Sequence, residues 1–203
     1  MTEDNDLQPI VAAEFLALAD LLRSVPAEAW DTPSLCEGWR VREVIAHLTM
    51  PARYNDKQFM AEFEAHGFDF TALSNDVAAR DGRAPVESLV SDLRSERLHH
   101  WAPPGGGYIG ALNHVVVHGL DVTVPVGATR ISPEATMCIV LDDLTEGGTH
   151  QHFGTDVAGR RLEATDLDWS WGSGPALRGT AADLVLVLCG RRLSEARLGG
   201  APL

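Results

Sequence analysis

Helix breakers divide the first two-thirds of the chain into long amphipathic segments, and this spacing constrains the fold more than any other feature. Within each segment apolar residues recur at three-to-four spacing, and prolines and glycines separate the segments. The pattern predicts helices over residues 7–25, 39–65, 85–101 and 108–124. We expect a kink at Pro51, because proline lacks the amide hydrogen that a helix interior uses. Helices of similar length with short breaks are typical of an up-and-down four-helix bundle.

The remainder of the chain has shorter segments and frequent glycine. Its expected elements are, in order, a helix (132–146), a β-hairpin turning at 172–175 and a helix (181–191). Residues 67–84 are polar and are assigned no element, although they include DGRAP, a turn signal. The sequence therefore predicts a mainly α protein. Residues 1–128 form a four-helix bundle with the functional site, and residues 129–203 form an α+β appendage (helix, β-hairpin, helix) packed on the bundle.

Composition narrows the classes of partner. The 203 residues are 45% hydrophobic and 22% charged, as in an ordinary globular protein. A net charge of −13 argues against nucleic acid and anionic membranes, since both select basic surfaces. No apolar run approaches the roughly 18 residues of a membrane span, and the acidic N-terminus is unlike a signal peptide. A cytoplasmic location is the expectation. The cysteines, which are few and widely spaced, do not form a disulfide framework.

The predicted helix at 108–124 carries the strongest functional signal. His114 and His118 lie one helical turn apart in an apolar run, so both imidazoles project from one face. Such a pair binds a transition metal well, and His47 on the second predicted helix is the best third ligand. The alternative is a pair of core histidines hydrogen-bonded to neighbouring helices. That alternative is less economical, because each buried ring then needs partners for both nitrogens.

Two carboxylates and two aromatic side chains lie close to these histidines in the sequence. Glu43 lies one turn before His47, and Asp121 lies one turn after His118, so each could accept the second ring N–H of its histidine. The alternative for both is a solvated or capping carboxylate. Trp39 and Tyr54 flank the His47 segment, and we expect them to line the substrate site. No catalytic residue is assigned.

The motifs around these residues resemble a known family. They are SLCEGWRVREVIAHL, NHVVVHGLDV and the C-terminal LEATDLDWSWGSGPALRGTAADLVLVLCGRR. The chain from Val11 to Arg192 resembles the DinB-like four-helix bundles, and within them the mycothiol-dependent maleylpyruvate isomerase family. The resemblance places His47, His114 and His118 on the metal-ligand positions. It implies a divalent metal, with zinc first and nickel second, and mycothiol as cosubstrate.

One position departs from the family pattern. The isomerase-type members have glutamate where this chain has His114. An imidazole in place of a carboxylate makes the site one charge more positive, which favours an anionic thiolate ligand and shifts the metal preference toward zinc or nickel. The departure puts the isomerase activity in question, though not the metal site.

Three classes of function follow from these observations. The first is a metal-dependent thiol transferase or isomerase, which activates a low-molecular-weight thiol such as mycothiol for reaction with an electrophile. The second is a metal-dependent hydrolase that uses bound hydroxide, with Glu43 or Asp121 as base. The third is a non-catalytic small-molecule-binding or stress protein on the same bundle. A monomer and a homodimer are both compatible with the sequence.

Overall fold

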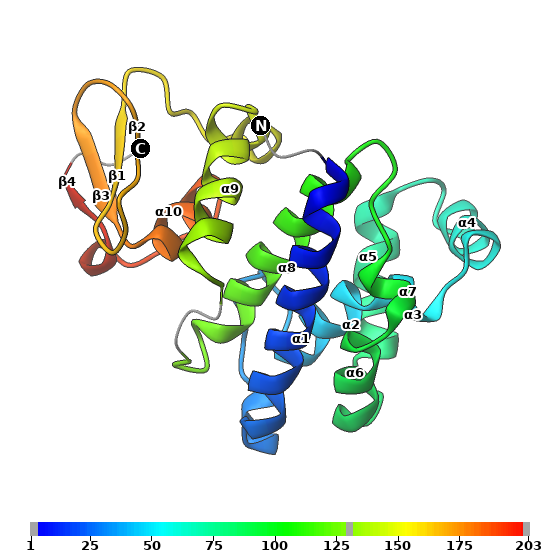
Figure 1. The fold of residues 1–203 in the computed structure, drawn as a ribbon. Coiled ribbons are helices and arrows are strands. Elements are labelled where there is room, and N and C mark those ends of the chain that lie inside the picture. Colours follow the sequence, from blue (N-terminus) through cyan, green and yellow to red (C-terminus); the bar gives the residue numbers. More distant parts are fainter. Residues whose placement is uncertain (1–3, 129–131, 201–203) are drawn as a thin grey trace. The chain divides into compact units, whose positions relative to one another are not determined.

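The computed structural model describes residues 4–128 and 132–200. The chain forms two compact units, Met1–Ile131 and Ser132–Leu203. The predicted domain boundary, between residues 128 and 129, lies at the edge of a segment outside the described residues. The predicted fold class is confirmed, since the chain is mainly helical with a small C-terminal sheet (Figure 1). Within the described ranges, no helix has the length and hydrophobicity to cross a membrane.

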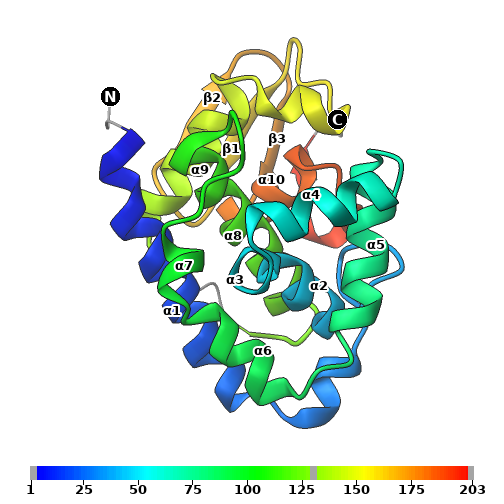
Figure 2. The same ribbon diagram turned by 90° about the vertical axis from the view of Figure 1, so that its right-hand side faces the viewer.

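In the described part of the first unit the regular elements are helices, with one isolated β-bridge between Pro33 and Arg40. The helices are η1 (Asp4–Leu7), α1 (Gln8–Ser24), η2 (Ala27–Asp31), α2 (Val41–Leu48), α3 (Met50–Arg53), α4 (Asp56–Ala65), α5 (Phe70–Asp81), α6 (Val86–Leu93), α7 (Glu96–His99) and α8 (Gly107–Thr123). Helix α1 packs against α8 and α6, and α2 packs against α5, α6 and α8. Figure 2 shows α6 beside α1 and α5 beside α2. The core between them is apolar and includes Val11, Phe15, Leu18, Val44, Leu48, Leu112 and Val116.

Helix α8 begins at a defined point because a distant carboxylate caps it. Asp4 accepts hydrogen bonds from the backbone amides of Tyr108 and Ile109, each at 3.1 Å. These amides have no partner within the helix, so the cap satisfies them and its negative charge suits the helix N-terminus. Gly107 has a φ of +59°, and a Cβ there would lie 2.7 Å from the Asp4 carboxylate. The helix that carries His114 and His118 is therefore anchored at its start.

The predicted helix over 39–65 is three helices, α2, α3 and α4, so the break is larger than the expected kink. The first break falls at Thr49, just before Pro51. The second follows Tyr54, which has extended backbone, and Asn55 then caps α4 by accepting from the Gln58 amide at 2.9 Å. The asparagine cap restarts the helix in a new direction.

Residues 67–84, to which the sequence pattern assigned no element, contain α5. Asp69 caps this helix by accepting from the Thr71 and Ala72 amides. A narrow face of α5 is fully buried, including Leu73 and Val77, and its many polar residues hide that face in the sequence. The predicted helix over 85–101 is likewise two helices, α6 and α7.

The second unit combines two helices with a sheet. Its elements are α9 (Glu134–Thr145), η3 (Thr149–Phe153), β1 (Arg161–Ala164), β2 (Ser170–Gly172), β3 (Ala176–Gly179), α10 (Ala181–Leu188), η4 (Glu195–Arg197) and β4 (Gly199–Gly200). The strand order is β2-β1-β3-β4, with β1 antiparallel to β2 and parallel to β3.

The predicted hairpin turning at 172–175 is therefore wrong. Strands β2 and β3 do not pair with each other; they lie on opposite edges of β1. The chain crosses the start of β1 between them, passing so close that a Cβ on Gly172 would lie 2.3 Å from the Arg160 carbonyl oxygen. A Cβ on Gly174 would lie 2.2 Å from the Gly159 carbonyl oxygen. These glycines permit a crossover, where the sequence pattern indicated a turn.

Candidate metal centre

Three histidines from two helices of the first unit meet at one point. His47 lies in the last turn of α2, and His114 and His118 lie on one face of α8. Their ring centroids are 4.9–5.2 Å apart, and one nitrogen from each ring lies within 4.8 Å of the others. The Nε2 atoms of His47 and His114 are 3.2 Å apart. Two ligand atoms on a tetrahedral zinc ion are separated by about 3.3 Å, so this spacing fits a shared cation.

Burial keeps two of these imidazoles in the neutral form that binds metals. His47 is 7% exposed, and burial, with a smaller contribution from His118, lowers its pKa to about 3. Burial and the two neighbouring histidines hold the pKa of His114 well below its ordinary value. The Nδ1 atoms of His47 and His114 are buried without a hydrogen-bond partner. These Nδ1 atoms therefore lack the acceptor that the second ring nitrogen of a metal-bound histidine usually has.

The third histidine is oriented by a buried carboxylate. The Nδ1 of His118 lies 2.9 Å from Oδ2 of Asp121, which is fully buried. This bond leaves Nε2 of His118 as the ring nitrogen available to a ligand. The structure therefore places Asp121 beside its histidine, in the position that the sequence indicated.

The same carboxylate oxygen binds a thiol. Cys36 donates its S–H to Oδ2 of Asp121 at 3.0 Å, and its sulfur lies 3.7 Å from Nδ1 of His118. The backbone of the same loop is joined to α8 as well, since the Leu35 amide donates to the Asp121 carbonyl at 3.0 Å. Two donors on one buried oxygen hold the carboxylate in place. The sequence offered no sign of this contact, because it joins distant segments.

Glu43 does not play the part that the sequence indicated. Its carboxylate accepts from the Arg40 backbone amide at 2.9 Å and from the Arg40 guanidinium. The Nδ1 of His47 that it was expected to bind has no hydrogen-bond partner. The reason is local geometry. Glu43 is the third residue of α2, where a carboxylate folds back onto the residue that precedes the helix.

Aromatic rings surround the histidines. The ring centroids of Trp39 and His47 are 5.0 Å apart, so Trp39 lies near the histidines, where the sequence placed it. Its indole N–H donates to Asn75. Two further contacts were not predicted. Phe70, which begins α5, lies 6.3 Å from His47, and Trp101 lies 5.8 Å from His114. Their places could not be derived from the sequence, because α5 itself was missed and Trp101 follows a separate short helix.

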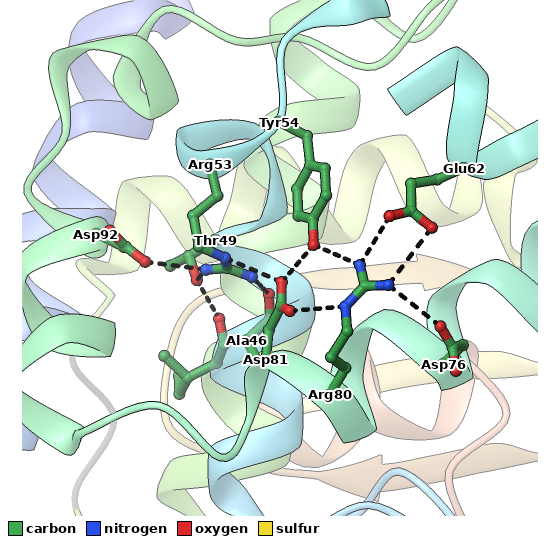
Figure 3. A network of polar contacts seen from close by, with 10 residues as sticks. Ala46, Thr49, Arg53, Tyr54, Glu62, Asp76, Arg80, Asp81 and Asp92 are labelled. Carbon is green, nitrogen blue, oxygen red and sulfur yellow. Dashed lines mark hydrogen bonds and ion pairs between the residues drawn. The ribbon is translucent and has the colours of Figure 1, made fainter. Parts of the chain in front are cut away.

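Tyr54 belongs to a different cluster, shown in Figure 3. Its hydroxyl donates to Asp81 at 2.9 Å and accepts from Arg80. It lines a cavity of about 460 Å³ together with Arg53, Arg80, Asp81 and Ala84. The expectation that Tyr54 lines the histidine site is wrong. The break between α3 and α4 turns it toward α5.

Comparisons with known proteins agree with this architecture. The model of the mycothiol maleylpyruvate isomerase N-terminal domain matches residues 11–104. A crystal structure of the mycothiol-dependent maleylpyruvate isomerase has a TM-score of 0.65 at 16% identity, over 99% of this chain and 96% of that chain. A histidine-to-alanine mutant of the mycothiol-dependent maleylpyruvate isomerase has a TM-score of 0.60, with the same identity and coverage. A search of curated proteins found no match.

The structural likeness at this low identity shows that the fold is shared along the whole chain. The family match covers His47 and ends before α8. The match of residues 11–104 to the model of the mycothiol maleylpyruvate isomerase N-terminal domain agrees with the resemblance seen in the sequence.

Proposed function

We propose that the chain is a metal-dependent enzyme, a thiol transferase or isomerase, that activates a low-molecular-weight thiol such as mycothiol. One observation carries the proposal: His47, His114 and His118 converge from two helices with nitrogens within 4.8 Å of one another. Neutral imidazoles suit zinc, with nickel as the second choice, and the side chains present therefore fit a divalent transition metal. The match of residues 11–104 to the isomerase-family model supports the thiol half of the proposal.

When bound, such a cation supplies charge that stabilises the thiolate form of a coordinated thiol. The protein's own groups prepare the site for it. Asp121 accepts the Nδ1–H of His118 and so holds the tautomer whose Nε2 is free. Burial of His47 and His114 keeps a proton from competing for their lone pairs at neutral pH. Trp39, Phe70 and Trp101 place aromatic rings beside the histidines.

A thiolate can serve either of two reactions. In a transfer, its sulfur forms a bond to an electrophilic carbon, and the leaving group departs with the electron pair. In an isomerisation, the sulfur adds to a carbon–carbon double bond conjugated to a carbonyl, the resulting single bond rotates, and elimination returns the thiolate. The imidazole of His114 makes the ligand set neutral, which favours the anionic sulfur in both reactions.

The hydrolase alternative has no comparable support. It requires Glu43 or Asp121 as a base for water. Glu43 is bound by Arg40, and its pKa is lowered because hydrogen bonds from Arg40 outweigh the effect of burial. Asp121 accepts from His118 and Cys36 on one oxygen. A carboxylate engaged in this way is a poor base.

The experiment measures thiol dependence directly. The zinc-loaded protein is incubated with mycothiol and either maleylpyruvate, as isomerisation probe, or 1-chloro-2,4-dinitrobenzene, as transfer probe. We expect turnover of at least one probe, abolished when mycothiol is omitted and in the His118→Ala variant. Hydrolysis of a p-nitrophenyl ester without thiol, together with no turnover of either probe, would overturn the proposal in favour of the hydrolase.

A further inference from the structure

The ring of His47 is held in a different way from the ring of His118. The ring of His118 is fixed by Asp121, whereas the Nδ1 of His47 has no hydrogen-bond partner. Histidines that bind metals usually donate their second ring N–H to an acceptor that fixes their orientation. Since no such acceptor is present, the position of His47 must depend on its backbone and on the rings packed beside it.

The backbone entering His47 is held by one guanidinium. Arg53 donates from Nη2 to the carbonyl oxygen of Ala46 at 2.6 Å. That carbonyl and the amide nitrogen of His47 belong to the same planar peptide group, so fixing one fixes the other. The bond matters because α2 ends here, where carbonyls lose their helical partners. Pro51 has no amide hydrogen to offer the His47 carbonyl.

Arg53 is itself held by two other helices and by the helix end, as Figure 3 shows. It donates to Asp81 of α5 at 3.1 Å and to Asp92 of α6 at 2.9 Å. It also donates to the Thr49 hydroxyl at 2.7 Å, which in turn donates to the Ile45 carbonyl at 2.6 Å. The guanidinium is therefore a rigid fork between α5, α6 and the last turn of α2.

Asp81 is also held by residues other than Arg53. Asp81 accepts from the Tyr54 hydroxyl at 2.9 Å and from Nε of Arg80 at 3.2 Å (Figure 3). The Arg53 side chain is only 22% exposed, so these bonds lie in a partly dry environment where they are stronger than at the surface. Motion of α2 against α5 or α6 would break several bonds at once.

We infer that Arg53 is a positioning residue for His47: with Asp81 and Asp92, it holds the Ala46–His47 peptide and thereby sets the place of His47 in the histidine cluster. The inference rests on the proposed metal site. Arg53, Asp81 and Asp92 (Figure 3) would position His47, as Asp121 orients His118.

The test compares two arginines of similar burial. Arg42 lies on α2, is 20% exposed, and bonds the Gly82 carbonyl and Asp31, away from the His47 peptide. Zn²⁺ affinity of Arg53→Met and Arg42→Met is measured by competition with a chromophoric chelator, at a temperature where circular dichroism shows both folded. We expect Arg53→Met to bind Zn²⁺ about ten- to a hundredfold more weakly, and Arg42→Met to stay within about twofold of the unmodified protein.

The visible absorption spectrum of the Co²⁺-loaded proteins gives a second measurement. A loss of stability alone does not change this spectrum. We expect the visible absorption bands of bound Co²⁺ to shift in Arg53→Met and to be unchanged in Arg42→Met. If Arg53→Met does not fold, Asp92→Asn replaces it, with an expected loss of about three- to tenfold in Zn²⁺ affinity. Equal affinities and spectra for the Arg42 and Arg53 or Asp92 variants would overturn the inference.

The two proposals fail in distinguishable ways. If the unmodified protein binds no Zn²⁺, or if His114→Ala keeps full affinity, the proposed metal site is itself wrong. If the unmodified protein binds one Zn²⁺ that His114→Ala loses, while Arg53→Met binds as the unmodified protein does, only the role of Arg53 is wrong.

Discussion

The pair Asp121→Asn and Glu43→Gln tests whether a carboxylate that bonds a proposed metal ligand affects metal binding more than one that does not. Both carboxylates lie one turn from a histidine in the sequence. In the structure only Asp121 bonds its histidine, at 2.9 Å, whereas Glu43 bonds Arg40. Each substitution removes one negative charge and keeps the shape of the side chain. The comparison therefore distinguishes the loss of the bonds to His118 and Cys36 from the loss of a negative charge alone.

The expected magnitude follows from burial and bonding. Asp121 is fully buried, and its Oδ2 accepts both the His118 ring N–H and the Cys36 thiol. A neutral amide is a weaker acceptor and leaves at least one of these donors poorly satisfied. Loss of such an orienting group lowers metal affinity by about ten- to a hundredfold, which corresponds to about 1.4–2.7 kcal/mol. For Glu43→Gln, the change in metal affinity should stay below about twofold, since Gln also serves in a capping box.

The assay is a competition titration of Zn²⁺ between the protein and a chromophoric chelator, with folding checked by circular dichroism. A similar decrease in the free energy of unfolding in both variants leaves the comparison intact, because each substitution replaces a charged hydrogen-bond acceptor by a neutral one. The reasoning is refuted if Asp121→Asn binds Zn²⁺ as tightly as the unmodified protein, or if Glu43→Gln weakens binding to the same extent.

Three further predictions concern the same cluster. Cys36→Ser should weaken Zn²⁺ binding a few-fold alone and add little in the Asp121→Asn background, as a double-mutant cycle shows, because both act on one oxygen. The pKa of His47 falls from 6.5 to about 3 on folding, so the unfolded chain binds more protons between these values. The metal-free protein should therefore lose stability as pH falls below about 6.5, and His47→Gln should reduce that slope by about 1.4 kcal/mol per pH unit in urea titrations. His114→Glu should lower the preference for Zn²⁺ over Mn²⁺ by about tenfold in metal competition, since a carboxylate suits harder ions; an unchanged ratio contradicts the reasoning.

Local patterns were sufficient to predict the frame of the site. The helical spacing of His114 and His118 requires only that α8 form, and its apolar run ensures this. The three-to-four pattern likewise located α1, and the helix-start signal at Ser132-Pro133 located the approximate start of α9. The placement of Asp121 beside His118 follows from the same periodicity, because one turn brings the two side chains together.

The remainder depends on contacts that local patterns do not encode. Whether Glu43 faces His47 or Arg40 is decided by the helix start, where folding back to Arg40 satisfies an unpaired amide. Phe70 reaches His47 from a helix whose buried face is narrow and obscured by polar neighbours. The crossover at Gly172 and Gly174 reads as a turn in the sequence, since glycine permits both.

Metal content of the purified protein tests the central claim most directly. The unmodified chain and its His47→Ala, His114→Ala and His118→Ala variants are loaded with Zn²⁺, passed through a desalting column and analysed by mass spectrometry of the metal. The account predicts about one Zn²⁺ per unmodified chain and a large loss in each variant, because three imidazoles converge on one position. Full retention of zinc in all three variants, or its absence from the unmodified protein, would contradict the account.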